Sequence, residues 1–266
     1  MARIVSALIL IPAVLALVIY ARPIYFLISL GILGTACLYE YFQLIRSMGI
    51  RPQPWLGYIA FWALLAAFRQ SRFPVTILIA LVLLAAFLAA MWRQCPVRER
   101  ALGMMANLSG VFYLALFLYP ALPLRFDFGN KLGMHWFIIL LVVIWIGDTA
   151  ALIIGKKFGR SLFAPVISPN KTNEGAAGGL LAGVVAASLM QHFIFTYLPL
   201  RHVIVVSLLL GMFGQLGDLA ESMLKRAAEV KDSSHMIPGH GGVLDRVDSL
   251  LFAFPVLYFY LLHLYA

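Results

Sequence analysis

Apolar runs long enough to cross a lipid bilayer recur along the whole sequence, and they constrain the fold more than any other feature. A membrane-spanning helix needs about 20 predominantly apolar residues, with a range of about 17–25. We place nine such runs at residues 4–20, 24–45, 55–70, 74–92, 101–119, 134–155, 176–197, 202–222 and 248–265. Because lipid offers no water to the backbone, each run is expected to be helical.

The composition agrees with a membrane protein. Of the 266 residues, 63% are hydrophobic and 12% are charged, whereas soluble domains are about 45–50% apolar and about 25% charged. We therefore predict an all-α, polytopic integral membrane bundle of about nine transmembrane helices. We treat residues 1–266 as one domain, in which 1–133 form N-terminal membrane helices and 134–266 carry the catalytic helices and cytoplasmic loops. The first run follows Arg3 and has no clear A-x-A cleavage site, so we expect an uncleaved helix.

The formal net charge of +9 is explained by membrane topology rather than by nucleic-acid binding. Lys and Arg residues collect in cytoplasmic loops. If the N-terminus is cytoplasmic, 14 of the 20 Lys and Arg residues lie inside and 6 lie outside. This bias predicts a cytoplasmic N-terminus. The two cysteines, Cys37 and Cys95, lack metal-ligand spacing and are expected to be inert packing residues.

Acidic residues concentrate near the C-terminus. Six of the 11 acids fall between positions 218 and 248: Asp218, Glu221, Glu229, Asp232, Asp245 and Asp248. On a helix, the positions i, i+3, i+4 and i+7 share one face, and here they are Asp218, Glu221, Ser222 and Lys225. A carboxylate inside an apolar helix is costly unless it is paired, hydrated or metal-bound. An intrahelical ion-pair ladder remains an alternative to a functional site.

A second acidic helix start follows a glycine-rich turn. Asp245 and Asp248 share the first turn of the last helix, where plain N-capping is the alternative. Between the two acidic segments lies Pro238-Gly-His-Gly-Gly242, whose backbone amides can approach an anion. Four cations flank this turn: Lys225, Arg226, Lys231 and Arg246. Paired carboxylates hold Mg²⁺ beside substrate phosphates, so the segment indicates nucleoside triphosphate chemistry.

The run from Ser222 to Asp248 resembles the signature of phosphatidate cytidylyltransferases, S-x-x-K-R…K-D…I-P-G-H-G-G-x-x-D-R-x-D. Every fixed position is filled over 27 residues, and the preceding residues 217–221 are similar to the family's G-D-x-x-E lead-in. Asp148-Thr149 and residues 155–160, the stretch 168–175, and the opening residues 3–12 resemble further family motifs. Ala150, Leu152 and Asn173 depart from the usual Gly, Tyr and Trp. Residues 20–140 match mainly in hydropathy.

The resemblance implies an enzyme that transfers CMP from CTP to phosphatidic acid, giving CDP-diacylglycerol and pyrophosphate in phospholipid biosynthesis. It implies an integral protein of the bacterial inner membrane with an active site facing the cytoplasm. The expected partners are CTP, phosphatidic acid and the lipid bilayer, without nucleic acid. Whether the chain forms a homodimer is left open.

The resemblance also assigns roles to residues. Asp218 and Asp245 are expected to bind Mg²⁺, and a second cation is left open. The catalytic set is expected to be Asp218, Lys225, Arg226, Asp245, Arg246 and Asp248. The substrate-binding set is expected to be Asp148, Lys171, Glu174, Glu221, Ser222, Lys231, Gly239, His240, Gly241 and Gly242. In this interpretation, Glu174 orients Lys171 and the 239–242 amides bind the leaving pyrophosphate. Glu40, in an early apolar run, is interpreted as structural.

Two other functions remain open from the sequence. The same chemistry on another lipid phosphate would leave the same motif. An ion-binding transporter would instead place acids near mid-membrane, on broken helices and in paired repeats. The acids of this chain cluster at one expected membrane face, which favours the enzyme.

Overall fold

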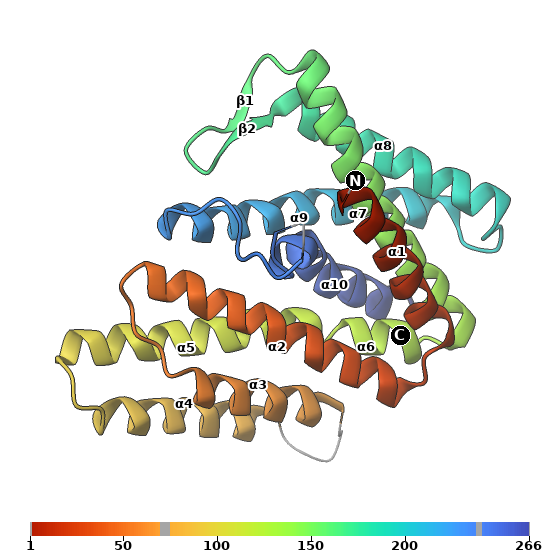
Figure 1. Ribbon diagram of the computed structural model, residues 1–266. Coiled ribbons are helices and arrows are strands. Elements are labelled where there is room, and N and C mark those ends of the chain that lie inside the picture. Colours follow the sequence, from red (N-terminus) through yellow and green to blue (C-terminus); the bar gives the residue numbers. More distant parts are fainter. Residues whose placement is uncertain (1, 70–74, 238–240, 266) are drawn as a thin grey trace. The chain divides into compact units, whose positions relative to one another are not determined.

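The computed structural model describes residues 2–69, 75–237 and 241–265, and these are predominantly helical (Figure 1). The helices are α1 (Ala2–Tyr20), α2 (Pro23–Ser47), α3 (Pro54–Arg69), α4 (Val75–Met91), α5 (Val97–Leu118), α6 (Ala121–Phe126), α7 (Asn130–Phe158), α8 (Asn173–Phe193), α9 (Leu200–Ala227) and α10 (Leu244–Tyr265). Each predicted apolar run overlaps one of the longer helices. The short helix α6 was not predicted from the sequence.

Within the described residues, six helical segments are long and apolar enough to cross a membrane. They are Pro23–Ser47, Val97–Phe126, Asn130–Phe158, Asn173–Phe193, Leu200–Ala227 and Leu244–Tyr265. Three further apolar segments, Leu8–Tyr20, Pro54–Ala67 and Val75–Met91, are shorter, at 10–17 residues. The chain is therefore an α-helical, polytopic membrane protein, and the number of nine spans stays a prediction.

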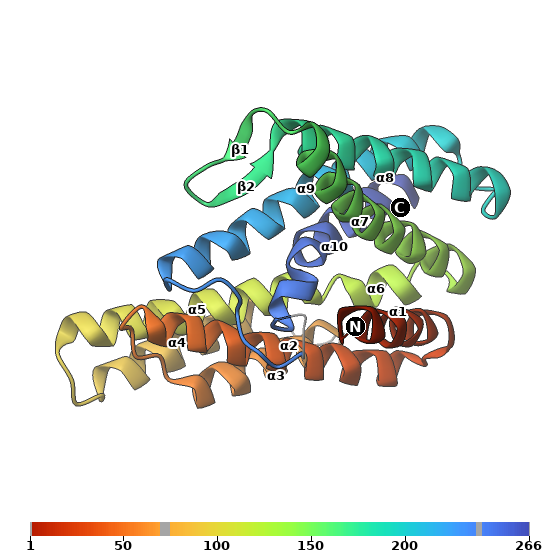
Figure 2. The same cartoon turned by 45° about the horizontal axis from the view of Figure 1, so that its top comes forward.

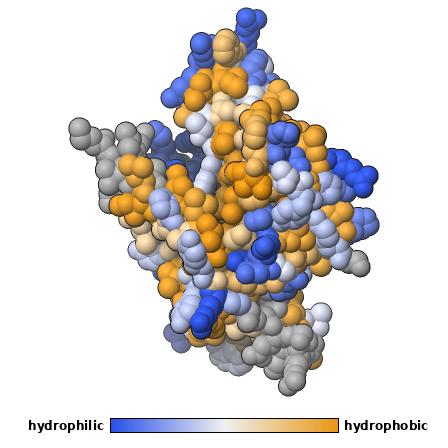
Figure 3. All heavy atoms as spheres, turned by 90° about the vertical axis from the view of Figure 1, so that its right-hand side faces the viewer, coloured by the Kyte–Doolittle hydropathy of each residue, from blue (hydrophilic) through white to orange (hydrophobic). Residues whose placement is uncertain are grey.

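Apolar side chains cover much of the molecular face shown in Figure 3. Leu81, Leu181 and Phe259, for example, are 51%, 65% and 65% exposed. Large contiguous apolar surfaces are unusual on soluble monomers. In a membrane protein such side chains face lipid, so their exposure does not carry the cost it would have in water.

The described chain separates into two compact units, which we describe individually. Unit 1 consists of Met1–Leu8, Ile24–Tyr119 and Leu224–Asp245, and unit 2 consists of Ile9–Pro23, Pro120–Met223 and Arg246–Ala266. Both units are therefore assembled from segments distant in sequence. The predicted division of one domain between 1–133 and 134–266 stays a prediction.

Unit 1 is built on α2, α3, α4 and α5, which run alongside one another in both ribbon views (Figures 1 and 2). Leu38, Leu64 and Leu114 are fully buried in its core. The Asn107 side chain, on α5, accepts from the backbone N–H of Gln53 and donates to the carbonyl of the same residue. This pair of bonds satisfies the backbone just before α3 begins.

Unit 2 contains a close helix pair, α7 and α8, that small residues make possible. Gly147, Ala151 and Gly155 on α7 recur every four residues, and Gly175, Gly179 and Gly183 do so on α8. A Cβ atom added to Gly179 would lie 2.7 Å from the carbonyl oxygen of Gly147 and 2.9 Å from the Ala151 Cβ. The two backbones therefore approach to a distance that a larger residue does not permit.

The connection between α7 and α8 contains regular secondary structure that the sequence did not predict. It contains the strands β1 (Leu162–Ala164) and β2 (Ser168–Thr172), which pair antiparallel and project as a hairpin (Figure 2). Thr172 ends β2 and caps α8, because its Oγ1 accepts from the Gly175 N–H at 3.1 Å. Strand β2 is thereby attached directly to the first turn of α8.

Candidate active site

A cavity of about 610 Å³ lies in unit 2 where α7, the hairpin, α8 and α9 meet. Its polar wall is formed by Asp148, Asn170, Lys171, Gln215 and Asp218. The remaining lining residues are mainly small or apolar: Ala151, Leu152, Gly155, Lys156, Phe163, Thr172, Gly175 and Ala176. The cavity therefore combines charged groups with an apolar side, and residues 148–176 form it together with residues 215–218 of α9.

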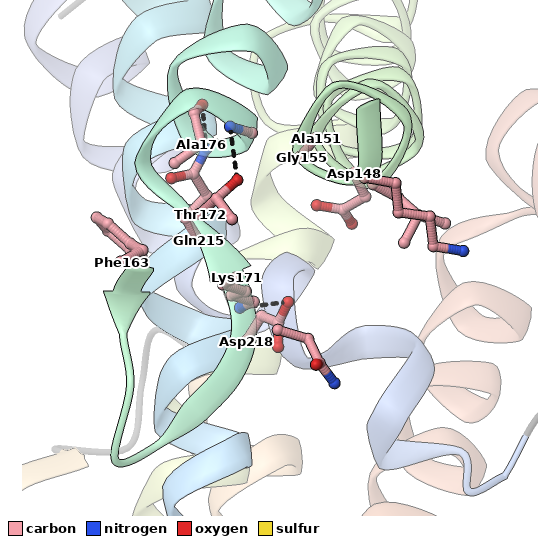
Figure 4. Close-up of a pocket in the computed structure, with 13 residues that line it drawn as sticks. Asp148, Ala151, Gly155, Phe163, Lys171, Thr172, Ala176, Gln215 and Asp218 are labelled. Carbon is pink, nitrogen blue, oxygen red and sulfur yellow. Dashed lines mark hydrogen bonds and ion pairs between the residues drawn. The ribbon is translucent and has the colours of Figure 1, made fainter. Parts of the chain in front are cut away.

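The charged groups of this cavity include a close ion pair. Lys171 Nζ, on β2, lies 2.6 Å from Asp218 Oδ2, on α9 (Figure 4). Asp148 extends from α7 toward the same part of the cavity (Figure 4). It forms no hydrogen bond or ion pair with any residue in the described ranges. Asp218, Lys171 and Arg246 are nevertheless near enough for their charges to interact with that of Asp148. Two carboxylates and two cations are thus close enough in unit 2 to interact electrostatically.

Local helix packing fixes these positions. The small-residue contact between α7 and α8 holds the α7 segment that carries Asp148 against the first turns of α8. The Gln215 side chain, one turn before Asp218 on α9, donates to the Ala176 carbonyl at 2.9 Å. Asp218 also accepts a hydrogen bond from Ser222 Oγ at 3.3 Å. The acid is therefore placed by contacts of α9 with α8 and within α9.

Glu174 has a different role from the one expected. Its carboxylate accepts from the backbone N–H groups of Arg160 and Ser161 and from the Ser161 hydroxyl, at 2.9–3.3 Å. Glu174 thus binds the start of the hairpin, and the partner of Lys171 is Asp218. The interpretation that Glu174 orients Lys171 was wrong for this structure. Asn173, one of the departures from the family pattern, joins this network by donating to Ser161 Oγ.

A second polar cluster lies in unit 1, in the loop between α9 and α10. We call residues 228–243 the signature loop; 238–240, with Gly239 and His240, lie outside the described residues. Asp245 Oδ1 lies 2.6 Å from Lys225 Nζ. Asp245 Oδ2 accepts from the Ser233 N–H, the Ser233 hydroxyl and the Gly242 N–H at 3.0, 2.9 and 2.7 Å. The Asp245 side chain is only 5% exposed.

Glu40, two turns before the end of α2, reaches the same loop. The residue is fully buried. Oε1 accepts from Ser234 Oγ at 2.5 Å and from the Val243 N–H at 2.8 Å. Oε2 accepts from the Leu244 N–H at 2.7 Å and lies 3.0 Å from Ser233 Oγ, whose single proton it shares with Asp245 Oδ2. No sequence motif includes Glu40, although a lone carboxylate in an apolar helix indicates buried partners.

Two glycines are required where the signature loop returns to α10. Gly241 has φ +80, in the left-handed region that favours glycine. A Cβ on Gly242 would overlap the Ser233 hydroxyl oxygen and lie 2.6 Å from Glu40 Oε2. The Gly242 N–H donates to the Asp245 carboxylate at 2.7 Å, and its contact with pyrophosphate stays a prediction.

Comparison with known proteins identifies the family of this chain. A profile of the Cytidylyltransferase family matches residues 1–264. The chain belongs to this family. Phosphatidate cytidylyltransferase of Bacillus subtilis (strain 168) is 46% identical over 132 residues, covering 50% of this chain and 49% of that protein. The proteins of the same name from Staphylococcus saprophyticus and Staphylococcus aureus (strain COL) are 45% and 44% identical over 125 residues, covering 47% of this chain and 48% of each relative.

The chain spans about half the length of the curated relatives it matches.

The other site residues that the resemblance implies differ in how far their side chains are buried. Glu221, Ser222 and Asp248 are buried, and Asp248 Oδ1 accepts from the Ser249 N–H at 2.7 Å. Arg226, Lys231 and Arg246 are more accessible than these three. The two acids are therefore enclosed in the protein, while the three cations are accessible to a ligand.

The resemblance to the family implies a bound Mg²⁺, and the side chains present can be compared with what this ion requires. The described residues contain no group of three or more His, Cys, Asp or Glu side chains arranged to hold a metal ion. Mg²⁺, however, is commonly bound through one or two carboxylates together with water and substrate phosphates. Asp148 and Asp218, which line one cavity, fit this requirement in number and chemistry. The shared metal site of Asp218 and Asp245 stays a prediction, because the two acids belong to different units.

Proposed function

We propose that this chain is a phosphatidate cytidylyltransferase, which makes CDP-diacylglycerol and pyrophosphate from CTP and phosphatidic acid. The relatives at 44–46% identity carry that name. The observation that supports the proposal most directly is the cavity of unit 2. Asp148, Lys171 and Asp218, from three separate motifs of the family, line it together. A charged cavity with an apolar side suits a reaction between a nucleotide and a lipid phosphate.

The reaction needs positioning and charge neutralisation more than a strong base. A phosphate oxygen of phosphatidic acid attacks the α-phosphorus of CTP, the bond to the β-phosphate oxygen breaks, and pyrophosphate leaves. The attacking phosphate monoester is already an anion at neutral pH. Lys171 and Arg246 are proposed to bind phosphate oxygens in unit 2, and Lys225, Arg226 and Lys231 are proposed to do so from the signature segment.

A magnesium ion bound by carboxylates of the site would neutralise charge on the phosphates of CTP and on the leaving pyrophosphate. We propose Asp218 and Asp245 as its ligands, with Glu221 and Asp248 as supporting acids. Asp148 is added as a candidate because it lines the same cavity as Asp218. A second cation is compatible with this number of acids.

The proposed membrane arrangement follows from charge and substrate supply. The N-terminus is cytoplasmic, the three shorter apolar helices also cross the membrane, and the active site lies at the cytoplasmic edge of the bacterial inner membrane. CTP then arrives from water and phosphatidic acid arrives from lipid. The large apolar surface can contact lipid, and part of it could equally pack against a second copy of the chain in a homodimer.

The test is turnover by the purified full chain in phospholipid micelles, with labelled CTP and phosphatidic acid, with and without Mg²⁺. We expect labelled CDP-diacylglycerol that requires Mg²⁺. Asp218→Asn and Lys171→Met should each lower kcat/KM by about 100-fold or more, since each removes a charge from the reacting site. The control, Lys131→Met, changes a Lys outside this cavity and should retain activity.

A panel of other lipid phosphates in the same assay decides the substrate. Preference for a different lipid phosphate would replace phosphatidic acid but keep the reaction class. No turnover on any lipid phosphate would refute the function. Full activity of Asp218→Asn would refute its metal assignment, and full activity of Lys171→Met would refute its phosphate contact.

A further inference from the structure

The Glu40 carboxylate connects an N-terminal helix to both ends of the signature loop. Its partners Ser233 and Ser234 precede the glycine-rich turn, and its partners Val243 and Leu244 follow that turn. The separation along the chain is 193 residues or more. All of these groups belong to unit 1. One buried side chain therefore joins the two sides of the loop at its base.

The hydrogen bonds of Glu40 match the capacity of an ionised carboxylate. Each of its two oxygens has two donors within hydrogen-bond distance, of which only the Ser233 hydroxyl is shared with Asp245, and an ionised carboxylate offers about four lone-pair sites. Two of the donors are backbone N–H groups, which cannot turn away or become acceptors. A neutral amide at this position would place an NH₂ group against at least one of them. The geometry thus requires a carboxylate, not merely a polar side chain.

Asp245 holds the same loop from a second direction. Its Oδ2 accepts from Ser233 and Gly242, and the Ser233 hydroxyl oxygen lies 3.0 Å from Glu40 Oε2 and 2.9 Å from Asp245 Oδ2. A bond between the Ile237 N–H and the Gly241 carbonyl closes the loop between these anchors. Two carboxylates from different helices therefore fix the base of the loop.

Because Glu40 is buried, its carboxylate depends on the signature loop keeping the conformation seen in the structure, which we call closed. A fully buried, ionised acid is strongly unfavourable unless hydrogen bonds compensate its lost hydration. For Glu40, all four donors belong to the signature loop or to Leu244, which directly follows it. Opening of the loop would leave Glu40 without them, so the buried charge favours the closed conformation.

We propose that Glu40 is a positioning residue that keeps the signature loop ordered before CTP binds. This inference rests on the proposed function, because it assigns the loop to CTP. When the binding-competent form is only partly populated, the apparent affinity falls by that fraction. Loss of Glu40 therefore raises the KM for CTP and leaves kcat nearly unchanged at saturating CTP.

The test compares Glu40→Gln with Tyr41→Phe by hydrogen–deuterium exchange and by CTP kinetics, using the full chain. Tyr41 is the next residue on α2, and Tyr41→Phe removes a 2.6 Å bond to Ser109 on α5 but leaves the signature loop untouched. For Glu40→Gln, we expect exchange in peptides covering residues 231–244 to rise about tenfold or more, together with a similar rise in the KM for CTP. Tyr41→Phe should change neither quantity.

Three results would overturn the proposal: unchanged exchange at residues 231–244, an equal rise throughout α2 and α5, or a fall in kcat with unchanged KM. If Glu40→Gln does not fold, Ser234→Ala tests the proposal instead, because it removes one of the four donors and leaves the carboxylate in place. We then expect a rise of about 2–5-fold in the same peptides and in KM; no rise overturns the proposal. If the wild type shows no turnover, the proposed function fails, and the exchange comparison still tests the role of Glu40.

Discussion

Substitution of Gly242 by alanine is expected to open the signature loop, although the change adds only one methyl group. The new Cβ would overlap Ser233 Oγ and lie 2.6 Å from Glu40 Oε2. The Ser233 hydroxyl must move, and it then loses the one hydrogen bond that it donates to a carboxylate. Glu40 must also shift, which strains its bond to the Leu244 N–H.

The magnitude follows from these two losses. A hydrogen bond to a charged group contributes about 1.5–3 kcal/mol. Two of them give about 3–6 kcal/mol, and each 1.4 kcal/mol corresponds to about tenfold in an equilibrium constant. Exchange at residues 231–244 should therefore accelerate by about 100-fold or more, measured by hydrogen–deuterium exchange of the full chain.

Gly49→Ala is the control for this experiment. Gly49 has φ +79, and a Cβ added there would meet no atom within 4 Å. The substitution therefore brings backbone strain of about 1–2 kcal/mol without overlap, and it should leave exchange at residues 231–244 unchanged. Ser233→Ala removes the overlapped oxygen, so Gly242→Ala should be less costly in that background. Strict additivity of the two substitutions, or equal effects of Gly242→Ala and Gly49→Ala at the loop, would refute the reasoning.

Three further predictions concern packing. Gly179→Val should separate α7 from α8 and lower the thermal unfolding midpoint in detergent, whereas Leu181→Val, on an exposed face, should not. Arg125→Met should destabilise the protein by about 3 kcal/mol in denaturant titration, because the buried guanidinium donates to the last carbonyls of α1; an unchanged midpoint would contradict this. Both cysteines are free, and maleimide should label Cys95 but not the fully buried Cys37; equal labelling would contradict the structure.

Much of the fold could be predicted from hydropathy because lipid imposes one secondary structure. The apolar runs became helices since each must satisfy its own backbone hydrogen bonds. Hydropathy does not, however, report how many helices cross the membrane: α1, α3 and α4 are apolar, but their candidate segments are short. The hairpin of β1 and β2 was missed because its strands are only 3 and 5 residues long and lie in a polar connection.

The candidate site was only partly predictable, and Lys171 shows why. Lys171 and Asp218 were both selected from motifs, but their 2.6 Å ion pair joins residues 47 positions apart. Helix periodicity relates residues within about two turns, and proximity in sequence suggested Glu174 as the partner of Lys171. The actual partner depends on where β2 meets α9, which is a matter of tertiary packing.

The class of protein, its helices and its family could all be read from the amino-acid sequence, because composition, apolar run length and a 27-residue signature are local properties. The sequence does not show which donors each acid interacts with. Glu40 belongs to no motif, yet four donors at the base of the signature loop lie within hydrogen-bond distance of its carboxylate. The glycine pattern predicts that the Gly242 N–H can approach an anion, but it does not indicate that the Asp245 carboxylate accepts from this group. Hydrogen bonds depend on distance and direction in space, and these are set when the helices pack.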